Sequence, residues 1–247
     1  MRRKIATTLV VGVLSVSAFG QAGTDIDPDA LKVLQAALQP VKNAQTYSFH
    51  ARIARDRPAT NGQILTYFQD EYITVSRPDK IRIDIAGEHH AVQLYSNAGH
   101  VSLFAPKASV YASAEAPKTI DQAIDALEKR DISFPMFYLF RSDPYAAIVD
   151  GIKTGYVIGT VNVYNKSFVH LAFTEPEANW QIWVELTAKP TLRRYEVVYT
   201  KRDLKPRVVV EFSDWNLAAT PAQNTFVFKA PADAHKIDFL RNAAEEK

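Results

Sequence analysis

The stretch HLAFTEPEANWQIWVELTAKPTLRRYEVVYT, residues 170–200, decides the fold class. It predicts three strands, His170–Thr174, Trp180–Glu185 and Leu192–Thr200, because aromatic and β-branched residues recur through each of them. Both prolines of the stretch lie between these strands, where a missing N–H breaks no hydrogen-bond ladder. The stretch therefore indicates antiparallel sheet.

The middle strand of this stretch has two chemically different faces, because successive side chains of a strand point to opposite sides. The even-numbered positions from Trp180 to Val184 are apolar, whereas the odd-numbered positions from Gln181 to Glu185 combine polar groups with one large ring, Trp183. This pattern predicts a curved sheet with one packed face and one face turned to a cavity or to water. It contains no catalytic motif.

Similar strand patterns occupy most of the chain. Residues 80–86, KIRIDIA, alternate strictly, and Asn97-Ala98-Gly99 forms the turn of a hairpin. Within the second strand, Asp70-Glu71 predicts a bulge or a solvent-facing segment. About eleven strands in succession predict one antiparallel sheet that curls into an unclosed half-barrel, since a sheet beyond about ten strands rarely stays flat. The strands expected are 47–54, 63–76, 80–86, 90–96, 100–105, 110–114, 155–164, 168–174, 180–185, 192–200 and 206–216.

Two helical regions accompany the sheet, so the fold class is mainly β with an α+β character. Asp27-Pro28 begins a helix with an apolar face from Leu31 to Val41. A helical insertion spans Pro117–Asp150. It contains a capping box at Thr119–Gln122 and the apolar run FPMFYLF at 134–140. The insertion could form a lid over a cavity or could simply pack on the sheet.

Residues 1–22 are expected to be a cleaved secretory signal peptide, with Arg2, Arg3 and Lys4 preceding an apolar run. Cleavage would lower the formal net charge from +2 to −1, so we expect no nucleic-acid partner. No later stretch is apolar enough to predict a membrane span. Residues 23–247 are expected to form a single periplasmic domain. The chain has no cysteine, which excludes thiol chemistry.

Several motifs resemble those of known periplasmic families. The segment RPDKIRID at 77–84 is similar to the strand entry of the outer-membrane lipoprotein carrier family, and NTFVFKAP at 224–231 is similar to that family's closing motif. HLAF at 170–173, WQIWVE at 180–185 and DW at 214–215 resemble the related DUF2092 family of predicted periplasmic proteins. The resemblance implies an unclosed β-barrel with a helical lid over an apolar cavity. It also implies that Arg77 bonds the lid backbone as a latch; the alternative is a surface arginine before a turn.

The leading functional hypothesis is a non-enzymatic periplasmic protein that binds or carries a hydrophobic ligand, such as an acyl chain, a lipid or a lipoprotein-like molecule. The candidate ligand contacts are large side chains of the expected strands and insertion: Tyr67, Tyr95, Phe104, Met136, Phe137, Phe140, Trp183 and Tyr199. We expect no catalytic residue, no metal site and no cofactor, because no nucleophile elbow, phosphate loop or metal-ligand spacing is present.

Two alternatives remain open. The interior could be filled by the protein's own aromatic side chains, which would favour an interaction module for another envelope protein. A hydrolase could instead use His170 with a carboxylate, which requires an open pocket around His170 and an Asp or Glu within hydrogen-bond reach.

Overall fold

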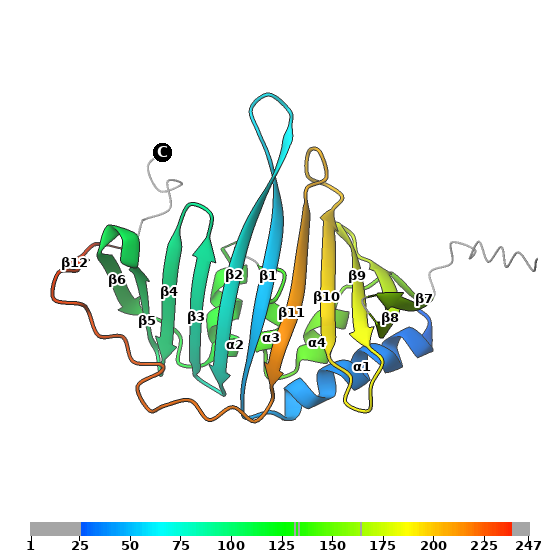
Figure 1. Ribbon diagram of the computed structural model, residues 1–247, viewed down its shortest axis with the longest axis horizontal. Coiled ribbons are helices and arrows are strands. Elements are labelled where there is room, and N and C mark those ends of the chain that lie inside the picture. The colour runs from blue at the N-terminus through cyan, green and yellow to red at the C-terminus, as the bar shows by residue number, and fades with distance from the viewer. Residues whose placement is uncertain (1–25, 131, 133, 164, 239–247) are drawn as a thin grey trace, which may run out of the picture.

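The computed structural model describes residues 26–130, 132, 134–163 and 165–238. The expected signal peptide at 1–22 lies outside the described residues, and so does Tyr164, the last residue of an expected strand. The described residues form one curved sheet with helices on one of its faces (Figure 1).

The sheet has twelve strands. They are β1 Thr46–Pro58, β2 Ile64–Ser76, β3 Lys80–Gly87, β4 Ala91–Asn97, β5 His100–Ala105, β6 Val110–Glu115, β7 Thr154–Val163, β8 Lys166–Thr174, β9 Ala178–Glu185, β10 Leu192–Tyr199, β11 Arg207–Asn216 and β12 His235–Lys236. The helices are α1 Pro28–Asn43, η1 Pro106–Ala108, α2 Ile120–Glu128, α3 Phe137–Phe140 and α4 Pro144–Val149.

The strand order is β12-β6-β5-β4-β3-β2-β1-β11-β10-β9-β8-β7, so the sheet is an unclosed half-barrel. Neighbouring strands are antiparallel, apart from the parallel pair β12–β6. Strand β1 pairs with both β2 and β11, which joins the two hairpin series of the chain. The predicted sheet is thus confirmed, with all eleven expected strands present.

The twelfth strand was not predicted. After β11 the chain runs along the lower edge of the sheet to β6 (Figure 1). There the amide of His235 donates to the carbonyl oxygen of Ser109 over 2.8 Å. The amide of Ile237 donates to the carbonyl oxygen of Tyr111, also over 2.8 Å. Two residues of pairing follow no alternation of side chains, so the sequence pattern gives no signal for β12.

The helices cover one face of the sheet unevenly. Helix α1 lies across the half formed by β7–β10, and the chain from α2 to α4 leads from β6, next to one edge strand, to β7 at the other edge (Figure 1). On the α1 side the space is filled by large side chains, including Phe173, Trp180 and Phe212, each at most 2% exposed. Large buried side chains therefore fill the core beneath α1.

A bulge or a solvent-facing segment was predicted at Asp70-Glu71, and the bulge is absent. Strands β1 and β2 pair without a break through this point, with Arg52 opposite Asp70 and Ala51 opposite Glu71. Because side chains alternate along a strand, Asp70 points away from the helices and Glu71 points toward them. Glu71 is only 7% exposed, so this segment does not face solvent on both sides.

Candidate functional site: an apolar cavity under the helical insertion

A cavity of about 570 Å³ lies between the β3–β6 part of the sheet and the helices of the insertion. A volume of this size falls within the roughly 300–1,000 Å³ of small-molecule sites. Its walls are mostly aliphatic, and the charged residues among them are Glu115 and Arg130. The lining residues contributed by the strands are Ile81, Ile83, Leu94, Ser96, Val101, Ala114 and Glu115, and those from the insertion include Ile120, Ala123, Ile124, Ala126, Leu127, Arg130, Ile132, Phe137 and Phe140.

Helix α2 forms one wall because its apolar side chains recur on one face. The Thr119 hydroxyl caps the helix by accepting a hydrogen bond from the amide of Gln122 over 3.3 Å, as the capping-box pattern predicts. The face toward the sheet carries the small residues Ala123 and Ala126 beside the buried Ile124. Small side chains here leave space that large aromatic residues, like those beneath α1, would fill.

A second cavity of about 140 Å³ adjoins the first. Both cavities are lined by Ile83, Leu94, Leu127, Phe137 and Phe140. The smaller cavity extends to the centre of the sheet, where Glu71 and Arg55 are the charged members of its wall. The two cavities thus lie side by side, and the smaller one has the polar residues Glu71 and Arg55 in its wall.

Arg77 joins three parts of the chain beside this region. Its Nη1 donates to the carbonyl oxygens of Val41 at 3.0 Å and Ala44 at 2.9 Å, at the end of α1. Its Nη2 donates to the carbonyl oxygen of Arg141 at 2.7 Å, within the insertion. The guanidinium also lies 4.8 Å from the centre of the Tyr47 ring. Arg77 is therefore no simple surface residue before a turn.

The side chain of Arg141 continues this connection into α2. Its Nη1 donates to Asp125 over 2.6 Å and its Nη2 donates to Glu128 over 2.6 Å. The amide of Ser142 donates to Asp121 over 2.9 Å. The residues after α3 are thus bound on one side to α2 and on the other to Arg77.

Three predicted ligand contacts lie in the insertion wall. Phe137 and Phe140 line both cavities, and Met136 lines the smaller one. Phe140 also stacks on Phe49 of the sheet at 6.5 Å between ring centres. These three residues remain our candidates for ligand contact.

Two of the predicted contacts, Tyr95 and Phe104, lie on the outer face of the sheet. Their strands turn Leu94 and Val101 toward the cavity, so alternation places Tyr95 and Phe104 on the opposite side. There both rings approach Phe228 of the C-terminal segment, at 5.3 and 5.9 Å between ring centres. Neither residue lines a cavity. The aromatic content of these strands did not indicate which of their faces points inward.

The other three predicted contacts also lie away from the two cavities. Trp183 is on the outer face and stacks on His170 at 4.1 Å between ring centres. Tyr67, near the first residues of β2, contacts His89 at 5.8 Å between ring centres. Tyr199 is half-buried at the edge of the core beneath Arg202, whose guanidinium lies 4.1 Å from the ring centre.

His170 lacks the surroundings that a hydrolase requires. Its Nε2 is hydrogen-bonded to the amide oxygen of Gln181 at 2.9 Å rather than to a carboxylate. Burial lowers the pKa of His170, with the bond to Gln181 acting in the opposite direction. The residue belongs to the outer face and lines neither cavity. These contacts count against His170 as a general base.

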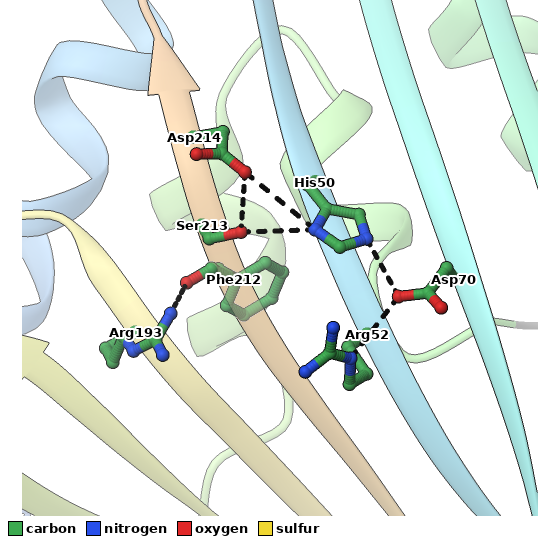
Figure 2. Close-up of polar contacts among 7 residues, drawn as sticks. All are labelled: His50, Arg52, Asp70, Arg193, Phe212, Ser213 and Asp214. Atoms are coloured by element: carbon green, nitrogen blue, oxygen red, sulfur yellow. Dashed lines mark hydrogen bonds and ion pairs between the residues drawn. The ribbon is translucent and has the colours of Figure 1, made fainter.

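A polar cluster that the sequence analysis missed lies on the outer face where β1, β2 and β11 meet (Figure 2). His50 Nε2 lies 2.9 Å from Asp70 Oδ1, and His50 Nδ1 lies 3.2 Å from Ser213 Oγ. Ser213 Oγ donates to Asp214 over 2.9 Å. Ser, His and Asp are the residue types of a hydrolytic triad, but this Ser lines neither cavity. The cluster connects three strands at a register shift of β1 against β11.

No group of three or more His, Cys, Asp or Glu side chains is arranged to hold a metal ion in the part of the chain that the structure describes. Across the same residues, no helix has the length and apolar character needed to cross a bilayer.

Glu71→Gln is expected to raise the free energy of unfolding at pH 7 and to leave it nearly unchanged at pH 4. Burial raises the pKa of Glu71 above its ordinary value of 4.5, although Gln69 and Arg55 oppose the shift. The carboxyl group therefore loses its proton at a lower pH in the unfolded chain than in the folded chain. The free energy of unfolding falls as the pH rises above the pKa of this group in the unfolded chain. Urea unfolding at pH 4 and pH 7 measures the difference.

The matched control for this prediction is Glu177→Gln, at an exposed position between β8 and β9. It should change the free energy of unfolding little at either pH. If Glu71→Gln changed the free energy of unfolding no more than Glu177→Gln does at pH 4 and at pH 7, burial of the Glu71 carboxyl group would not be unfavourable.

Comparison with solved structures finds similar chains at low sequence identity. A conserved uncharacterised protein from Thermus thermophilus has 10% identity and a TM-score of 0.48, covering 85% of this chain and 99% of that one. The lipoprotein LppX from Mycobacterium tuberculosis has 12% identity and a TM-score of 0.47, covering 78% and 98%. A LolA superfamily protein from Nitrosomonas europaea has 10% identity and a TM-score of 0.38, covering 81% and 97%.

Comparison with curated protein sequences finds no match. The model of one family, described as predicted periplasmic protein DUF2092, matches residues 30–240. This range includes every strand of the sheet, both cavities and the contacts of Arg77. The chain therefore belongs to the DUF2092 family of predicted periplasmic proteins.

Proposed function

We propose that the protein binds and carries a hydrophobic ligand in the periplasm, with the ligand held between the sheet and helix α2. The observation that carries this proposal is the apolar cavity of about 570 Å³. Burying hydrocarbon there would contribute about 0.8 kcal/mol for each CH₂ group, so no elaborate polar motif is required. A long acyl chain fits such walls.

The distribution of side chains favours a carrier over an interaction module with a filled interior. The interior is filled beneath α1, where Phe173, Trp180 and Phe212 are fully buried. Under α2 the wall carries Ala123 and Ala126 instead, and the space stays open. An interior selected only for stability would gain from larger side chains at these positions, because voids forfeit contacts.

In this proposal Arg77 acts as a latch on the insertion. Its guanidinium bonds carbonyls of both α1 and the insertion, so opening the insertion away from α1 requires the bond to Arg141 to break. Ligand entry would then proceed by movement of α2 and α3, which Arg141 ties together.

The proposal predicts that the exported protein copurifies with lipid. Organic extracts of the purified protein should contain acyl compounds at close to one molecule per chain by mass spectrometry. The delipidated protein should bind a fluorescent fatty acid with saturation at one site. Extracts free of lipid, together with no fluorescence change on titration, would contradict the proposed function.

A further inference from the structure

Glu71 is an unusual side chain for the wall of an apolar cavity. It is the one charged or polar residue in the buried class among the described residues, with 7% of its surface exposed. Its neighbours in the smaller cavity include Ile83, Ile85 and Val210. One carboxyl oxygen accepts a hydrogen bond from Gln69 Nε2 at 2.6 Å. Burying a carboxyl group among aliphatic side chains costs free energy unless the group has partners or a use.

Arg55 lies on the same face of the sheet and lines the same cavity. The nearby Arg52 and Arg207 face Asp70 and Asp56 within 4 Å. By contrast, within the described ranges no ion pair or hydrogen bond engages the guanidinium of Arg55, and it lies close enough to Glu71 to act on that group electrostatically. The smaller cavity thus has a cationic donor and a carboxyl group at one end and hydrocarbon elsewhere.

The chemistry of this pair favours a particular kind of head group. Burial favours the neutral form of Glu71, which can donate a hydrogen bond through its hydroxyl. Arg55 supplies several N–H donors in a planar fork that matches a carboxylate. A guanidinium and a protonated carboxyl group in the wall of one small cavity suit a ligand group that only accepts hydrogen bonds and carries negative charge.

We propose that Arg55 and Glu71 form a subsite for the carboxylate of a long-chain fatty acid, whose hydrocarbon tail lies in the larger cavity. Because the two cavities share five lining residues, they lie side by side, and a chain held in both would pass along these shared side chains. This inference rests on the proposed function and adds to it the identity of the ligand's head group. A neutral lipid ester is the competing ligand, since it would use the same hydrocarbon walls but not the charge of Arg55.

The test compares palmitate with methyl palmitate as displacers of a fluorescent probe from the delipidated protein. The unaltered protein should bind palmitate about tenfold more tightly than the ester, the effect of about one charged hydrogen bond. Arg55→Gln should remove this preference by weakening palmitate binding while leaving the ester unchanged. Glu71→Gln, which retains a donor, should keep most of the preference, whereas Glu71→Val should reduce it.

Arg57→Gln is the matched control, because Arg57 is exposed beyond the cavity on the same strand. It should reproduce the binding of the unaltered protein. Equal binding of acid and ester by the unaltered protein overturns the subsite whether or not the variants fold, and leaves the carrier proposal standing. If neither palmitate nor methyl palmitate displaces the bound probe, the subsite and the carrier proposal are overturned together.

Discussion

Ala123→Trp is expected to weaken binding of a long-chain acyl ligand by more than about 100-fold while leaving the fold intact. Ala123 lies on the cavity side of α2, and the space beyond its methyl group is open. An indole ring there would displace about four methylene groups of the ligand, worth about 0.8 kcal/mol each, or about 3 kcal/mol together. Displacement titrations of the fluorescent fatty acid measure this loss.

Gln122→Trp is the matched control, because Gln122 is the neighbouring exposed position of the same helix and lines neither cavity. It should bind like the unaltered protein. The thermal midpoint of Ala123→Trp should be equal or higher, since the ring fills a void rather than overfilling a packed core. Unchanged ligand affinity in Ala123→Trp would place the ligand outside this cavity.

Arg77→Met is expected to lower the free energy of unfolding by about 3–6 kcal/mol, because Nη1 and Nη2 both lose their carbonyl partners and a hydrogen bond from a charged donor contributes about 1.5–3 kcal/mol. The thioether cannot donate to the carbonyls of Val41, Ala44 and Arg141. Urea unfolding gives the loss of stability. Hydrogen exchange should also accelerate in residues 117–150 more than in β8–β10, since the insertion loses its connection to α1.

Arg52→Met provides the comparison for that variant. Arg52 is an exposed arginine of β1, and its contact with Asp70 lies at the surface, where ion pairs contribute about 0–1 kcal/mol. If Arg77→Met were as stable as Arg52→Met and the exchange of the insertion were unchanged, the latch would be refuted.

The sheet could be predicted from the sequence because its signals are local. Strict alternation in KIRIDIA and in the strand at Trp180–Val184 fixes which side chains share a face, and hairpin turns join most neighbouring strands. The even positions of β9 proved to face the core, with Trp180 2% exposed. Pairing of β1 with β11 is long-range, and no local pattern in the sequence predicts it.

The cavity could be predicted only in part. The run at 134–140 indicated a lid, and Met136, Phe137 and Phe140 do face the interior. Tyr95 and Phe104 also looked like ligand contacts, but Phe228, more than a hundred residues away, covers them on the outer face. The sequence pattern gives the two faces of a strand but does not say which face a distant segment will cover.

The polar end of the smaller cavity was not predicted, because Glu71 was expected to be solvated and is buried. Asp70-Glu71 looks like a solvated pair, but the uninterrupted register of β2 directs Glu71 inward. The signal that could have found Glu71 was present in the chain, since Ile73 and Val75 continue the same face and are buried. Following the alternation backward from these residues predicts a carboxyl group at the cavity wall.

Intermolecular NOEs between a ¹³C-labelled acyl ligand and the protein's methyl groups would show where the ligand lies in the protein. A ligand bound between the sheet and α2 should show contacts from its acyl chain to methyls of Ile83, Leu94 and Ile124, which line the larger cavity. Contacts confined to exposed apolar side chains of the outer face, or ligand signals that show no protein contact at saturation, would contradict binding in this cavity.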